Sequence, residues 1–150
     1  MKKITLILLF FAAINIVKAQ TVLKPGDVAI VHINKAYESF DFVPLVAITT
    51  GTVIEFTDMK YSAALRRFVP FANPQYDGKH TFTATQNYAA GTVIQSKGNL
   101  LESKKFITSN TEGNTLIAFQ VNNNDTTYLT AIGWYTAINF KPGISDIPPG

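Results

Sequence analysis

Short stretches of alternating hydrophobic and polar residues recur along the chain from residue 27 onward. Each stretch is rich in β-branched or aromatic residues, and turn-forming residues separate one from the next, which is typical of β-strands. We predict strands at residues 27–34, 39–48, 52–58, 80–85, 92–96, 115–121 and 127–134. In the third of these, Ile54 and Phe56 should face inward; in the fourth, Phe82 and Ala84 should do so.

This pattern gives about seven short strands and no convincing helix. Strands with one apolar and one polar face fit two antiparallel sheets packed against each other, so we predict an all-β antiparallel β-sandwich. Pro44 lies inside the second stretch. Because proline cannot donate a hydrogen bond to a neighbouring strand, we expect that strand to lie at a sheet edge or to be bulged there.

The tetrapeptide Gly-Thr-Val-Ile occurs twice, at residues 51–54 and 91–94. Glycine adopts a positive φ without steric cost, so Gly51 and Gly91 should each close a turn that leads into a β-branched strand. Stacked repeat architectures need at least three units. We therefore interpret the repetition as one local turn used twice.

The first nineteen residues differ in character from the rest. Lys2 and Lys3 precede an apolar run from Ile4 to Val17, and Val17-Lys18-Ala19 offers small residues at the spacing that signal peptidase accepts. The run is shorter than the roughly 20 residues that cross a bilayer. We predict a signal peptide at residues 1–19, a β-sandwich domain at 20–150, and no transmembrane span after cleavage.

Charge and cysteine content narrow the class of protein. Without Lys2, Lys3 and Lys18, the chain has 10 basic and 10 acidic residues, which gives no basic stripe for nucleic acid. The chain has Cys 0, so neither disulfides nor a lipid-anchored N-terminal cysteine can form. We expect a secreted protein, extracellular or on the outer cell surface, with the periplasm as the alternative location.

Five fragments occur in an order that resembles a family of exported modules common in Bacteroidota, similar to the lamin-tail β-sandwich. They are LKPGDVAIVHIN, SFDFVPLVAITTGTVIEFTD, YDGKHTFTAT, AAGTVIQSKG and NTEGNTLIAFQ. The resemblance implies an immunoglobulin-like or lamin-tail-like sandwich within a secreted or surface protein, without catalysis by the module. Met59-Lys60-Tyr61 replaces the family's Asn-Gly-Trp, and Glu112-Gly113-Asn114 replaces its Ser-Gly-Asp. Similar modules continue beyond Ser-Asp-Ile-Pro-Pro-Gly, which leaves open a C-terminally incomplete domain.

The stretch between residues 59 and 79 is the most individual part of the chain. Its first ten residues could form one or two helical turns, whereas two prolines and a glycine break the remainder. Long loops between strands commonly carry binding function. We therefore choose Asp58, Tyr61, Tyr76 and Asp77 as candidates for ligand or partner binding, with the tyrosine rings available to stack on a sugar or a protein.

The titratable residues give little support to catalysis. Asp58 and Asp77 could form the pair of acids that glycoside hydrolysis needs, but both occupy positions that suit turn-forming, solvated acids. Calcium held by loop oxygens is a third reading. His32 and His80 lack the ligand spacing of a metal motif, and we expect them to be surface or edge residues.

We therefore expect a non-catalytic structural or interaction module, with no catalytic residue, no metal site and no cofactor other than the calcium alternative. Its partner would be a protein or a glycan at the cell surface. A glycan-binding module is the alternative function, followed by the accessory domain of a secreted hydrolase. The sequence leaves the oligomeric state open.

Overall fold

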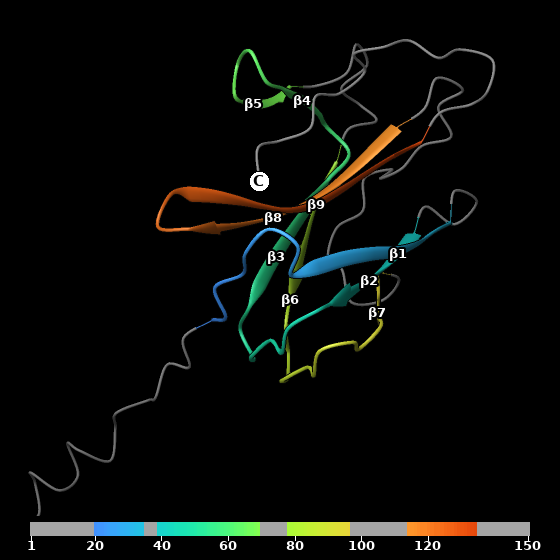
Figure 1. The fold of residues 1–150 in the computed structure, drawn as a ribbon, viewed down its shortest axis with the longest axis vertical. Coiled ribbons are helices and arrows are strands. Elements are labelled where there is room, and N and C mark those ends of the chain that lie inside the picture. Colours follow the sequence, from blue (N-terminus) through green and yellow to red (C-terminus); the bar gives the residue numbers. More distant parts are fainter. Residues whose placement is uncertain (1–19, 35–38, 70–77, 97–113, 135–150) are drawn as a thin grey trace, which may run out of the picture.

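The chain is built from antiparallel strands. The computed structural model describes residues 20–34, 39–69, 78–96 and 114–134, and these contain nine strands and no helix (Figure 1). The strands are β1 (Val28–Asn34), β2 (Ser39–Pro44), β3 (Val53–Thr57), β4 (Lys60–Ser62), β5 (Arg67–Val69), β6 (Lys79–Thr83), β7 (Ile94–Gln95), β8 (Asn114–Asn122) and β9 (Asp125–Trp134). Every strand pair is antiparallel. The predicted all-β antiparallel class is confirmed, with β4 and β5 added to the seven expected strands.

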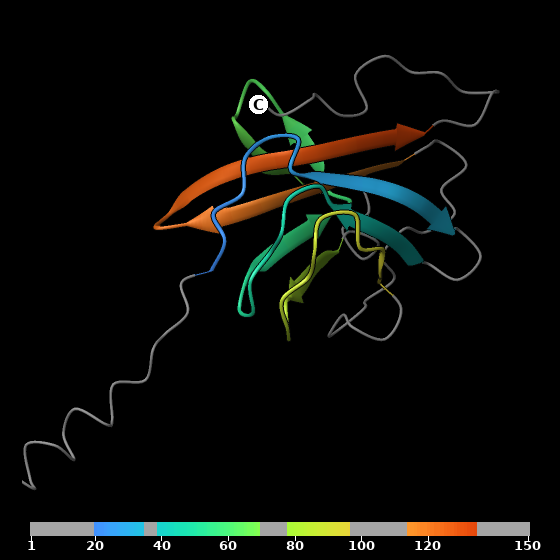
Figure 2. The ribbon, with the colours of Figure 1, turned by 60° about the horizontal axis from the view of Figure 1, so that its bottom comes forward.

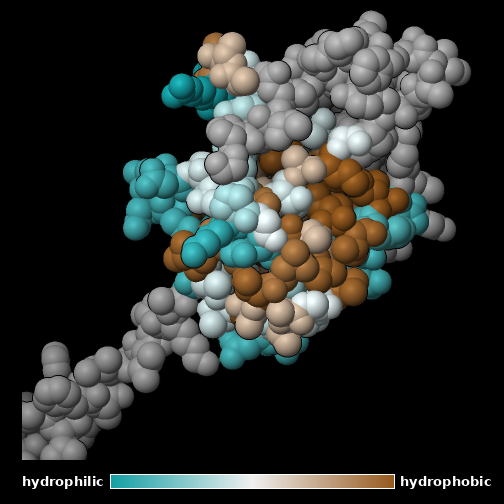
Figure 3. Space-filling view, in the orientation of Figure 1, coloured by the Kyte–Doolittle hydropathy of each residue, from teal (hydrophilic) through white to brown (hydrophobic). Residues whose placement is uncertain are grey.

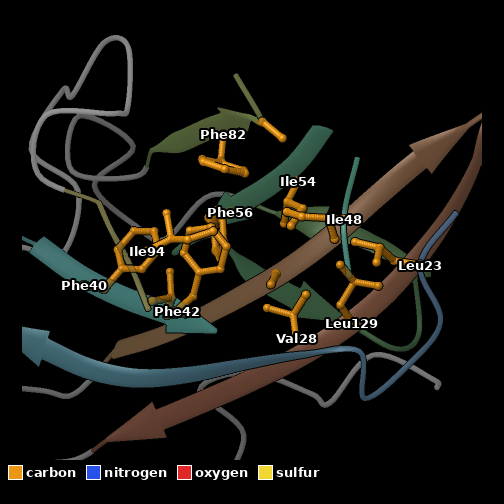
Figure 4. Packing of buried hydrophobic residues seen from close by; sticks show 13 residues of the cluster. Leu23, Val28, Phe40, Phe42, Ile48, Ile54, Phe56, Phe82, Ile94 and Leu129 are labelled. Atoms are coloured by element: carbon orange, nitrogen blue, oxygen red, sulfur yellow. The ribbon is translucent and has the colours of Figure 1, made fainter. Parts of the chain in front are cut away.

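Two of the sheets form facing layers. One has the strand order β1-β2-β7 and the other β6-β3-β8-β9, and Figure 2 shows them from a second side. The third sheet is the small β4-β5 hairpin. A core cluster lies between the two larger sheets, where the rings of Phe40 on β2 and Phe56 on β3 are 4.7 Å apart (Figure 4). The arrangement is consistent with a β-sandwich-like fold.

The core follows from the alternation along each strand. Ile54, Phe56, Phe82 and Ala84 are all buried, as expected. The other members of the cluster are Leu23, Val28, Phe40, Phe42, Ile48, Ile94, Leu116, Ala118 and Leu129. Burying one such large side chain contributes about 1.5 to 3 kcal/mol, and this is the main force that holds the layers together.

Pro44 occupies a different position from the one predicted. It is the last residue of β2, which is the middle strand of its sheet. The bulge in this sheet lies instead in β1, between Ile30 and His32. A terminal proline removes no interior hydrogen bond, and its carbonyl accepts one from the backbone N–H of Gly91 at 2.8 Å.

The two Gly-Thr-Val-Ile stretches begin with the same turn. Gly51 has φ 86° and Gly91 has φ 83°, so the expected positive φ is confirmed at both positions. In the first turn, the backbone N–H and the hydroxyl of Thr52 both donate to the Thr49 carbonyl, at 3.0 and 2.7 Å. Thr92 donates in the same two ways to the Ala89 carbonyl, at 3.2 and 2.7 Å.

The repetition extends beyond the turns. Ile54 of β3 pairs with Phe82 of β6, and Ile94 of β7 pairs with Phe42 of β2. Ile94 follows Ile54, and Phe82 follows Phe42, by forty residues, so each strand pair joins one residue of the first copy to one residue of the second. The first unit consists of β2 and β3, and the second of β6 and β7. The backbones of Ile48 in the first unit and Tyr88 in the second exchange two hydrogen bonds of 2.9 Å. Each unit thus spans both sheets and pairs with its counterpart. The interpretation as a purely local turn was too narrow, because the partners of the strands repeat as well.

Alanine at Gly51 or Gly91 is expected to lower the free energy of unfolding by about 1 kcal/mol at either site. A Cβ atom would meet nothing within 4 Å at either glycine, so the cost arises from the positive φ alone. Urea denaturation of both variants measures it. Gly51→Asn is the matched control, because asparagine tolerates this conformation and should cost less. Equal stability of the alanine and asparagine variants would contradict the account.

A buried glutamine fixes the segment before β1. Gln120, fully buried on β8, accepts the Leu23 N–H at 2.8 Å and donates to the carbonyls of Thr21 and Val53 at 3.0 and 3.1 Å. A buried amide is costly unless its hydrogen bonds are satisfied. These contacts satisfy it and hold Leu23 in the core.

Candidate functional site

The stretch after β3 folds into a β-hairpin, and the predicted helical turns are wrong. Lys60 pairs with Val69, Tyr61 with Phe68 and Ser62 with Arg67. Alanine, leucine and arginine favour helices, but an isolated helix of about ten residues is marginal in water. The hairpin instead places Tyr61 and Phe68 together against the larger sheet.

An aromatic cluster anchors this hairpin to the outer face of the four-stranded sheet. The ring of Tyr61 lies 5.3 Å from Tyr128, and the ring of Phe68 lies 5.2 Å from Phe119. Ile117 and Phe119 are buried on this outer face, whereas Leu116 and Ala118, which alternate with them, face the core. β8 is therefore covered on both faces. Its uninterrupted apolar run Leu116–Phe119 is the sequence signal that could have revealed this second cover.

Tyr61 is only 2% exposed, so its ring is not presented to solvent. Its ring lies edge-on to that of Tyr128. The pKa of Tyr128 is raised, first by burial and then by the neighbouring Tyr61 hydroxyl. In this arrangement, Tyr61 packs the hairpin against the four-stranded sheet. A role in binding stays a prediction for Tyr61, and Tyr76 lies outside the described residues.

Asp58 joins the two ends of the excursion between β3 and β6. It is 1% exposed, and its Oδ1 accepts the Gly78 N–H at 2.7 Å. Next to it, the Thr57 hydroxyl donates to the Gly78 carbonyl at 2.8 Å. Asp58 thus forms a turn, as one reading proposed, but it is buried rather than solvated. Asp77 lies outside the described residues, and both its pairing with Asp58 and calcium binding stay predictions.

Replacing Asp58 with alanine is expected to lower the free energy of unfolding by about 1 to 3 kcal/mol, because the partly buried Gly78 N–H loses its acceptor. Asp58→Asn keeps an oxygen at that place and should recover part of the loss. Thermal and urea unfolding of the two variants test this. If alanine and asparagine were equally mild, the hydrogen bond to Gly78 would not fix the hairpin ends.

The two histidines have different surroundings. His32 is exposed and its Nδ1 lies 3.2 Å from Asp41 Oδ2, so the surface prediction holds for it. His80 is 5% exposed, with its ring edge-on to Phe40 at 6.0 Å. Burial lowers the pKa of His80 to about 4, partly opposed by Glu55. His80 is not a surface residue, because it precedes the inward Phe82 by two residues and shares its face. The edge position is confirmed, since β6 is the outermost strand of its sheet.

The tip of the hairpin, residues 63–67, is the part of this region that is open to solvent. Every residue of the tip is exposed, and Leu65 is 56% exposed. Figure 3 shows the hairpin projecting from the body of the molecule, with hydrophobic and hydrophilic residues side by side on it. Of the candidate residues chosen from the sequence, Asp58 and Tyr61 are buried at the hairpin's base, and Tyr76 and Asp77 lie outside the described residues. The hairpin tip itself was missed, because its exposure depends on the anchor beneath it.

Arg66 and Arg67 bring two positive charges to the hairpin tip. The described part of the chain shows one ion pair, Lys79 with Glu55, and one contact between His32 and Asp41, and neither arginine takes part in either. Arg66 closes the turn with a backbone hydrogen bond of 3.3 Å to the Ala63 carbonyl. An exposed aliphatic side chain beside two free guanidinium groups can contact a partner through apolar burial and charge-assisted hydrogen bonds.

Comparison of the chain with protein-family models, curated proteins and solved structures returned no match. Within the four described segments, no helix is long and apolar enough for a membrane crossing, and no three His, Asp or Glu side chains gather where a metal could bind.

Proposed function

We propose that this chain is a non-catalytic interaction module of a secreted or cell-surface bacterial protein, with an immunoglobulin-like or lamin-tail-like sandwich as its support. The β4–β5 hairpin is the contact element. The observation that carries the proposal is that this hairpin has a packed base and an exposed tip. Tyr61 and Phe68 pack against the sheet, whereas Leu65, Arg66 and Arg67 are exposed to solvent. The expected signal peptide and the resemblance to exported modules support the location.

The exposed hairpin tip is positioned by packed residues beneath it. Binding residues lie disproportionately on projecting loops whose supports are packed. Here the support includes the buried Asp58 at the hairpin's base and the aromatic cluster under its strands. A contact made by the hairpin tip therefore costs little additional ordering of the backbone.

Binding of the labelled protein to the surface of the cells that produce it tests the proposal. We expect saturable binding that weakens several-fold in the Leu65→Ser variant, because Leu65 supplies the exposed apolar contact. Val93→Ser is the matched control, since Val93 is 59% exposed and lies on the turn before β7, away from the hairpin. Absence of saturable binding, or equal loss in both variants, would contradict the proposal.

Glycan binding would need aromatic rings aligned on an exposed face. Among the described residues of this region, Tyr61 is buried and Phe68 packs against Phe119 and Tyr128. We therefore do not adopt it as a second function. A glycan array separates the two readings, because specific hits that survive Leu65→Ser would favour a glycan site elsewhere on the chain.

A further inference from the structure

We propose that the hairpin tip docks an acidic segment of a partner protein, with carboxylates on Arg66 and Arg67 and an apolar side chain on Leu65. This inference rests on the proposed function, since it names the partner of the same hairpin. It is carried by the charges of the tip, by the backbone at Arg66 and by the position of Leu65.

The charges at the tip contrast with those on the rest of the described chain. Several described carboxylates are already engaged: Asp41 by His32, Glu55 by Lys79 and Thr81, and Asp58 by the Gly78 N–H. Neither Arg66 nor Arg67 forms an ion pair with a described residue. The tip thus displays the guanidinium groups of two consecutive, exposed residues on a chain whose basic and acidic residues balance after the predicted leader.

The backbone at Arg66 is the second observation. Arg66 has φ 51°, a conformation in which a side chain other than that of glycine or asparagine is disfavoured. The other described residues with positive φ are glycines 26, 51 and 91 and asparagines 123 and 124, the latter two in the β8–β9 turn. Arginine at such a position is therefore the exception in this chain. Strained backbone retained with a large side chain is a reason to suspect that the side chain has a function.

The chemistry of the tip selects an acidic protein segment over other anions. The guanidinium group matches the two oxygens of a carboxylate and binds them side by side. Leu65, 56% exposed beside the arginines, gains only from a partner that also carries an apolar side chain. Two charges are too few to hold a nucleic acid, whose binding requires neutralising many phosphates. Alternating acidic and apolar residues in an extended peptide satisfy all three side chains.

Fluorescence anisotropy with a labelled peptide of alternating glutamate and leucine tests the inference. We expect binding that weakens as salt screens the charges, and no binding of the same peptide with lysine in place of glutamate. Arg67→Gln and Arg66→Gly should each weaken binding about two- to fivefold, the range for exposed ion pairs. Lys24→Gln is the control, because Lys24 is also an exposed cation but lies on the loop before β1.

Arg66→Gly also separates binding from folding. Glycine relieves the positive φ, so the urea midpoint of this variant should stay the same or rise while its peptide affinity falls. Equal loss with Lys24→Gln, no effect of either arginine variant, or heparin binding as tight as peptide binding would overturn the inference. If the peptide fails while Leu65→Ser still reduces binding to cells, the acidic partner is wrong and the hairpin remains the contact element.

Discussion

Replacing Phe42 with alanine is expected to lower the free energy of unfolding by about 3 to 5 kcal/mol, the range typical of removing a buried aromatic ring. Phe42 is fully buried on the middle strand β2. The rings of Phe56 and Phe82, from the opposite sheet, lie 4.9 and 5.1 Å from it. Removing this ring leaves a cavity between the layers that their backbones cannot close. Urea denaturation of the variant and the parent measures the loss.

Leu45→Ala is the matched control for Phe42. Leu45 follows β2 directly but is 53% exposed, so its truncation should change the free energy of unfolding by less than about 1 kcal/mol. A loss at Phe42 no larger than that at Leu45 would mean that the two sheets do not share a core at this point.

Acidification is expected to remove about 3 kcal/mol of stability through His80 alone. Its pKa is about 4 in the folded chain, against an ordinary value of 6.5, because burial disfavours the charged ring. The unfolded chain therefore takes up a proton first as the pH falls below about 6.5. The stability that His80 contributes is complete above that pH and is lost as the pH approaches about 4.

His80→Gln isolates this contribution from that of the carboxylates, which also titrate near pH 4. Glutamine cannot become charged, so the variant should show a shallower fall of unfolding free energy between pH 6.5 and 4 than the parent. Denaturant unfolding at several pH values across this window gives both slopes. Parallel slopes would contradict the prediction, because they would mean that folding does not lower the pKa of His80.

The strands of the sandwich could be predicted because their alternation is local. Ile54, Phe56, Phe82 and Ala84 were assigned to the core from spacing alone, and all four are buried. Residues 60–69 could not be assigned in this way, since their helix propensity is overridden by the contact of Tyr61 and Phe68 with β8 and β9. Residues distant in the sequence decide this segment.

The same distinction applies to the candidate site. Asp58 was chosen for its position at a strand end, and it does close the excursion that follows β3. Sequence alone could not show that Asp58 would be buried, because its hydrogen-bond partner Gly78 lies twenty residues further along the chain, directly before β6. The exposure of Leu65 and the positive φ of Arg66 depend on the turn between β4 and β5, which the helical interpretation concealed.

The two units, spaced forty residues apart, form the part of the sandwich that lies on either side of the hairpin in the sequence. The two units pair with each other twice, β2 with β7 in one sheet and β3 with β6 in the other. These pairings do not involve the hairpin. The β4–β5 hairpin lies between the two units in sequence and adds to the outer face of one sheet. Substitutions at the hairpin tip are therefore expected to have little effect on the core.

Nuclear Overhauser contacts in the labelled protein test the central claim, that two matched units exchange strands between facing sheets and carry the hairpin on the outside. We expect cross-strand contacts of Ile54 with Phe82 and of Ile94 with Phe42, together with contacts between Tyr61 and Tyr128. Helical contacts over residues 60–69, or only one of the two repeated strand pairs, would contradict this arrangement.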